Sequence, residues 1–192
     1  MSMTRLLILG LVRMAQPVHG YEVRRELLSW RVDEWANLQP GSIYHSLKKL
    51  AEEGLLEAAE PEQVGNRPAR TPYRITASGE RVFQEMLRRY WWEYRQPVDP
   101  FVAAMSFLPV LSAREAAAAL RNRAKVLRLN CDQLRQVADE GFLDPDTPSH
   151  VAEMFRLWIA RSEGEIEWCE RVAERVERGE FEDDSNGLIK FD

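Results

Sequence analysis

The stretch Gln39-Pro-Gly-Ser-Ile-Tyr-His-Ser-Leu-Lys-Lys-Leu-Ala-Glu-Glu-Gly-Leu-Leu56 decides the fold of this chain, because it predicts one short helix with a signal at each end. Pro40 suits the first helical position, where its missing N–H would have no acceptor within the helix. Gly54 suits the left-handed position that ends a helix. Apolar residues between these two recur at helical spacing and form one stripe: Ile43, Leu47, Leu50 and Ala51.

The opposite face of this predicted helix carries small hydrogen-bonding groups, one imidazole and amines. Its members are Ser42, His45, Ser46 and Lys49, with Lys48 at the edge. The first acids, Glu52 and Glu53, come only in the last turn. Such a face can approach a polyanion, although on this segment alone an ordinary solvated surface helix is the simpler explanation.

A predicted hairpin follows the helix and changes this balance. Leu55–Ala59 and Tyr73–Thr76 read as short strands, and the loop between them is rich in Pro and Gly. No Asp or Glu occurs from Val64 to Gly79, whereas three arginines do: Arg67, Arg70 and Arg74. A helix followed by a hairpin with a basic tip is the layout of a winged helix-turn-helix, in which the helix enters the DNA major groove.

The rest of the first half is predicted to be helical. Helices are expected over Thr4–Ala15, where Leu7, Leu11 and Met14 would be buried, and over Val18–Trp30, with a loop through Trp35. A further helix begins at the N-cap Thr76 and runs to Tyr94. Pro97 and Pro100 mark a boundary, so residues 1–96 are predicted to form a winged helix-turn-helix DNA-binding domain.

Two long apolar seams predict an antiparallel helical hairpin in the second half. Both alternate spacings of three and four residues. The first comprises Ala113, Ala117, Leu120, Ala124, Leu127, Cys131, Leu134 and Ala138, and the second Ala152, Phe155, Ile159, Ser162, Ile166, Cys169, Ala173 and Val176. So thin a hairpin needs a second copy to cover it, so residues 97–180 are predicted to be a dimerisation domain and 181–192 a flexible acidic tail. The expected fold is mainly α with a small β-hairpin wing.

Charge and composition favour a nucleic-acid-binding first half and exclude several other classes. The net charge is −5, but residues 1–95 carry 14 Lys and Arg against 12 Asp and Glu, whereas residues 96–192 carry 12 against 19. Two cysteines and three scattered histidines match no common metal-ligand spacing, so we expect no metal and no cofactor. The apolar run within Met1–Ala15 is too short to cross a membrane, and a cytoplasmic location is expected.

Several short motifs together resemble the PadR family of bacterial transcriptional regulators over roughly residues 3–95. They are His19-Gly-Tyr-Glu22, Gly41-Ser-Ile-Tyr44, Leu47-Lys-Lys-Leu50, Glu53-Gly-Leu-Leu56, and Tyr73-Arg-Ile-Thr76 followed by Gly79. The second half, with Asp99-Pro-Phe101, is similar in layout only. The resemblance implies a homodimer that binds inverted-repeat operator DNA, usually as a repressor released by a small molecule. His45 departs from the family, which commonly has proline there.

Nine residues are the candidate DNA contacts: Ser42, Tyr44, His45, Ser46, Lys48, Lys49, Arg67, Arg70 and Arg74. The helix residues suit base edges and the wing arginines suit phosphates. Tyr44 either donates to a phosphate or seals the core, and His45 either reads a base or is simply solvated. Arg24 and Arg25 either reach a phosphate or pair with Glu22 and Glu26.

Five aromatic residues are candidates for binding a small aromatic effector: Tyr90, Trp91, Trp92, Tyr94 and Trp158. Flat rings bind aromatic molecules by stacking. Packing at the domain junction or in a dimer contact is the favoured explanation for such a cluster, with the ligand pocket as the alternative.

No nucleophile elbow, phosphate-binding loop or His/Cys cluster is present, so we expect no enzyme. A DNA-binding transcriptional regulator, probable as a repressor on family grounds, is the first hypothesis. A winged-helix module for protein–protein assembly is the second, and the acid-free stretch Val64–Gly79 favours the first.

Overall fold

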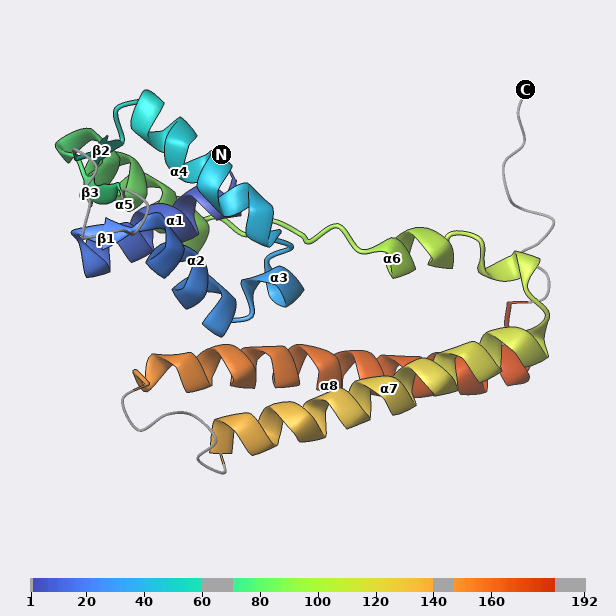
Figure 1. Cartoon of the computed structure of the whole chain (residues 1–192). Helices are drawn as coiled ribbons and strands as arrows, with labels where there is room; N and C mark the ends of the chain where they lie inside the picture. The colour runs from blue at the N-terminus through green and yellow to red at the C-terminus, as the bar shows by residue number, and fades with distance from the viewer. Residues whose placement is uncertain (1, 60–70, 140–146, 182–192) are drawn as a thin grey trace, which may run out of the picture. The chain divides into compact units, whose positions relative to one another are not determined.

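The computed structural model describes residues 2–59, 71–139 and 147–181, and the chain divides into two compact units, Met1–Gln96 and Pro97–Asp192 (Figure 1). Each unit has a hydrophobic core of its own. Within the described ranges, no helix combines the length and the apolarity that crossing a membrane requires.

The first unit is a helical domain with a small antiparallel sheet. Its elements are α1 (Met3–Ala15), β1 (Val18–His19), α2 (Gly20–Ser29), α3 (Val32–Trp35), α4 (Pro40–Glu52), β2 (Leu56–Ala58), β3 (Pro72–Ile75) and α5 (Ala77–Trp92). The strand order is β1-β3-β2, so β3 is central. Helices α1, α2 and α4 pack on one another, and α5 packs on α1 and β3. The expected winged-helix fold is confirmed.

The segment Val18–Trp30 is not one helix, as the sequence had suggested. Val18 and His19 form β1, which pairs with Tyr73 and Pro72 of β3. Helix α2 begins only at Gly20, because His19 is extended and its N–H donates to the carboxylate of Glu22 at 2.9 Å. A two-residue strand has no periodic signal of its own, and its pairing with β3 prevents the helix from starting earlier.

Two smaller expectations were also wrong. The predicted loop before α4 contains the short helix α3, where the indole N–H of Trp35 donates to the carbonyl of Trp30 at 2.7 Å. In α1, Met14 is 73% exposed, and the buried residues are Ile8, Leu9, Leu11 and Val12. Helix α1 is packed by α2, α4, α5 and β3, so it buries a wider arc than one stripe.

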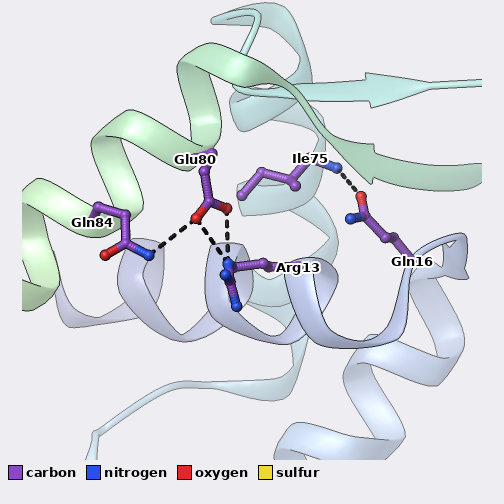
Figure 2. Close-up of polar contacts among 5 residues, drawn as sticks. All are labelled: Arg13, Gln16, Ile75, Glu80 and Gln84. Carbon is purple, nitrogen blue, oxygen red and sulfur yellow. Dashed lines mark hydrogen bonds and ion pairs between the residues drawn. The ribbon is translucent and has the colours of Figure 1, made fainter.

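Polar side chains of α1 connect this helix to both α5 and the central strand (Figure 2). The guanidinium Nε of Arg13 donates to both carboxylate oxygens of Glu80 at 2.9 and 2.8 Å, and the amide of Gln84 donates to the same carboxylate at 3.0 Å. The backbone N–H of Ile75 donates to Oε1 of Gln16 at 2.9 Å. These contacts hold β3 and the first turns of α5 against α1.

The start of α5 lies unusually close to the end of α4. The hydroxyl of Thr76 caps α5 by accepting from the N–H of Gly79 at 3.0 Å, and it donates to the carbonyl of Gly54 at 2.8 Å. A Cβ at Gly79 would lie 2.0 Å from the carbonyl oxygen of Leu55. Only glycine therefore permits this approach.

Replacing Gly79 by alanine should destabilise the first unit severely. The added methyl group meets backbone, which cannot rotate away, so we expect a loss of about 3 kcal/mol in the free energy of unfolding. Urea unfolding followed by far-UV circular dichroism measures this loss.

Gly41→Ala is the matched control, because Gly41 also lies in the first turn of a helix but has no atom within 4 Å of an added Cβ. That variant should be neutral or stabilised by about 0.5 kcal/mol. Equal stabilities of the two variants would contradict the close contact at Gly79.

The second unit is built on a helical hairpin of α7 (Ala113–Asp139) and α8 (His150–Glu177), preceded by α6 (Pro100–Met105) and the 3-10 turn η1 (Leu108–Val110). The two predicted seams form its interior, with Leu120, Ala124, Cys131 and Cys169 almost fully buried. Both thiols are reduced, and burial raises the pKa of Cys169. Phe101 of α6 packs edge-on against Trp168, with the guanidinium of Arg123 3.8 Å from the centre of the Phe101 ring.

Ion pairs cross between α7 and α8 along one flank of the hairpin. They join Arg121 to Glu177, Arg128 to Glu170 and Arg135 to Glu163. The arginines are seven residues apart and so are the glutamates, as expected for antiparallel helices in one register. On the other flank Arg123 pairs with Glu165 at 2.5 Å.

Candidate nucleic-acid interface

The outer face of α4 is open to solvent in the first unit. Ile43, Leu47 and Leu50 are buried on the inner side, whereas Tyr44, His45, Lys48 and Lys49 are exposed and Ser42 and Ser46 are half-buried. The helix thus presents every candidate residue that the sequence had placed on this face. The hydroxyl of Ser42 donates to the carbonyl of Gln39 at 2.7 Å, so Ser42 offers lone pairs rather than a free proton.

The charge of this face is positive because the nearby acids are paired. The carboxylate of Glu53 lies 2.6 Å from the guanidinium of Arg5 on α1, and that of Glu52 lies 3.8 Å from the amine of Lys48. Lys49 makes no ion pair with any residue that the structure describes. Its ammonium group is therefore available to an anion in front of α4.

Tyr44 combines the two roles that the sequence had left open. Its side chain is 49% exposed, yet its ring lies against the start of α2, where a Cβ at Gly20 would be 3.2 Å from Cε1. The ring therefore seals the contact between α2 and α4 while one side remains open to solvent.

The wing arginines divide into one that is described and two that are not. Arg74 is exposed on β3, and Arg67 and Arg70 lie outside the described residues. The register places Glu57 of β2 directly opposite Arg74. Sequence spacing could not reveal this acid, since Glu57 lies outside the acid-free stretch and approaches only through strand pairing.

The aromatic candidates do not form a pocket within the described residues of either unit. Trp91, Trp92 and Tyr94 are 81%, 86% and 84% exposed at the end of α5 and just beyond it. Trp158 belongs to the second unit, where its ring packs edge-on against Phe155 at 5.4 Å between centroids. Packing inside the first unit therefore does not account for the rings at the end of α5.

The described ranges contain no group of three or more His, Cys, Asp or Glu side chains that could hold a metal ion. The chemistry of the α4 face is instead that of hydrogen bonding and positive charge. Those are the properties with which proteins bind the base edges and phosphates of duplex DNA.

Known structures share this fold across almost the whole chain. Bacillus subtilis PadR in complex with operator DNA is 20% identical with a TM-score of 0.70, covering 90% of this chain and 98% of that one. The same protein in complex with p-coumaric acid is 19% identical, with a TM-score of 0.67 and the same coverage. The PadR-like regulator BC1756 from Bacillus cereus is 17% identical, with a TM-score of 0.57, covering 92% of this chain and 99% of that one.

No curated protein matches the chain in sequence. Residues 8–85 do match the PadR-like family of transcriptional regulators, and this range contains α2, α4, the described strands and most of α5. The resemblance seen in the sequence motifs is confirmed, and through this domain the chain belongs to the PadR-like family of transcriptional regulators.

Proposed function

We propose that this protein is a DNA-binding transcriptional regulator that places α4 in the major groove. The observation that carries the proposal is the exposed outer face of α4, on which Lys49 is unpaired among the described residues and no acid precedes Glu52. His45, Ser46 and Lys49 would contact base edges, and Ser42 would accept hydrogen bonds there. Such a role would place the protein in the cytoplasm.

The wing would bind the DNA backbone beside the groove. Arg67, Arg70 and Arg74 would contact phosphates, as would Lys48 and Tyr44 at the edge of α4. Because Glu57 faces Arg74, we expect Arg74 to contribute less than the other two arginines. An operator-bound relative with this fold supports repression from an inverted repeat as the mode of action.

Substitutions on α4 should weaken specific binding more than random binding. We expect His45→Ala and Lys49→Ala to lower affinity for the DNA upstream of the protein's own gene about fivefold, or ~1 kcal/mol, with a smaller effect on a random duplex. Arg67→Ala and Arg70→Ala should weaken both alike and make the salt dependence shallower by about one phosphate contact each. Fluorescence anisotropy at several salt concentrations measures both effects.

Arg88→Ala is the matched control, because Arg88 is exposed on α5, away from α4 and the wing. Equal losses on specific and random DNA for the α4 variants would refute base reading. A wild-type protein that binds no duplex at all would favour the second hypothesis, a winged-helix module for protein–protein assembly.

The second unit supports a homodimer as the working form. Apolar side chains remain exposed on the outer sides of both long helices: Val126 (55%) and Leu129 (58%) on α7, and Leu157 (50%) and Met154 (38%) on α8. The hairpin cannot cover these side chains itself, since its interior is filled by the seam residues. A second copy of the chain would cover them, and two α4 helices would then read the two halves of an inverted repeat.

An acidic side chain on these outer faces should separate the dimer and leave the hairpin folded. Leu129→Asp and Leu157→Asp are preferable to changes at Leu127 or Phe155, because Leu127 packs into the hairpin and Phe155 is half-buried against Trp158. We expect dimeric wild type and monomeric variants by light scattering, with unchanged helix content by circular dichroism. A monomeric wild type at micromolar concentration would refute the proposal.

Response to a small aromatic molecule completes the proposed function. The rings of Trp91, Trp92 and Tyr94 are uncovered in the first unit, and Tyr90 is 43% exposed. A flat molecule that stacks on them would stabilise one arrangement of the chain over another. Coupling of about 1.4 kcal/mol suffices for a tenfold loss of operator affinity. The p-coumaric acid bound by Bacillus subtilis PadR supports phenolic acids as the first class to test.

Phenolic acids should quench tryptophan emission and lower operator affinity together. We expect Trp91→Phe or Trp92→Phe to weaken binding of p-coumaric acid or a related compound severalfold, whereas Trp30→Phe, in the same unit on the end of α2, should not. Affinity unchanged in both α5 variants would move the site elsewhere, with Trp158 next to be tested. A compound that binds without changing operator affinity would show the aromatic cluster to be packing surface.

A further inference from the structure

Two arginines on α2 have no role in the interface described above. Arg24 and Arg25 are both exposed, on a helix whose Val23 and Leu27 are buried. The sequence left open whether they pair with neighbouring acids or reach an anion. The side-chain contacts of α2 decide between these alternatives.

The neighbouring acids of α2 are engaged with other donors. The carboxylate of Glu22 accepts from the N–H of His19 at 2.9 Å and from the hydroxyl of Tyr21 at 3.1 Å, and chiefly the first of these bonds lowers the pKa of Glu22. Glu26 accepts from the indole N–H of Trp30 at 3.1 Å. Among the described residues neither arginine makes an ion pair, whereas Arg5, Arg13 and Arg31 of the same unit each make one.

The two arginines differ in position around α2. Arg24 follows Gly20 by four residues, so it lies on the same side of the helix, one turn further on. Gly20 is the residue that meets the ring of Tyr44 on α4. Arg25 lies further around the helix, where it acts electrostatically on Glu22. Arg24 therefore borders the α4 face on the Tyr44 side, and Arg25 does not.

We propose that Arg24 binds a phosphate of the DNA backbone beside the groove that α4 enters. This inference rests on the proposed function. Tyr44 and Lys48 are four residues apart on α4, so they share the flank next to α2, and Arg24 extends that row of donors onto a second helix. A guanidinium without a carboxylate partner is suited to a phosphate, with which it forms charge-assisted hydrogen bonds.

Arg24→Gln and Arg24→Glu test the proposal, with Arg88→Gln and Arg88→Glu as controls that change the net charge equally. Arg88 is exposed and makes no ion pair with a described residue, and it lies on α5, which packs on α1 and β3. A labelled random-sequence duplex is titrated at about 50 to 200 mM salt. For Arg24→Gln we expect the slope of log K against log salt to become shallower by about 0.9, and affinity at 0.1 M salt to fall roughly five- to tenfold. Arg24→Lys should retain the wild-type slope.

The slope reports contacts per bound molecule, so a variant that is only partly folded still answers the question. An Arg24→Gln slope equal to that of Arg88→Gln, with normal binding by wild type, overturns this inference and leaves the proposed function standing. A wild type that binds no duplex overturns the proposed function and this inference together.

Discussion

The carbonyl oxygen of Leu55 is the point on which the first unit depends. It accepts from the backbone N–H of Thr76 at 3.1 Å, and Gly79 of α5 lies directly on it. The end of α4, the start of β2 and the start of α5 therefore meet at one backbone atom. From there α5 reaches α1 through Glu80 and Arg13, and α1 returns to β3 through Gln16. This closed series of contacts fixes the distance between α4 and the wing, and rigid support is what a surface needs in order to match a rigid duplex.

Pairing of charges, more than their number, determines what the first unit can bind. Exposed ion pairs such as Arg13–Glu80 and Arg31–Glu34 add little stability, but each neutralises an acid and a base locally. The cations left unpaired among the described residues therefore dominate the nearby field. Lys49 on α4 and Arg24 on α2 are two of these, on helices that pack together. A chain with a net charge of −5 can in this way present a surface suited to a polyanion.

Local signals predicted most of the fold, whereas features created by chain pairing escaped sequence reasoning. The limits of α4, the left-handed Gly54 (φ +70°), the N-cap Thr76 and the seams of α7 and α8 were all predicted, because capping and periodicity act within a few turns of one helix. Strand β1 and the position of Glu57 opposite Arg74 were missed, because both exist only through their pairing with β3. The α4 side chains could be assigned to the outer face from spacing alone. Their roles at DNA, and those of Arg67 and Arg70, stay predictions.

The hairpin of the second unit shows why a repeating pattern does not define a unique structure by itself. If α8 slipped by seven residues along α7, Arg121 would meet Glu170 and Arg128 would meet Glu163, so most of the ion pairs on that flank would form again. The opposite flank does not repeat. Seven residues from Glu165 stand Trp158 and Val172, so after a slip Arg123 would lose its carboxylate. Arg123 also lies over the ring of Phe101, which contacts Trp168, so the same slip would detach α6. The register is therefore set by the one flank where α6 is anchored, and that register decides which apolar side chains the outer faces present to a second copy.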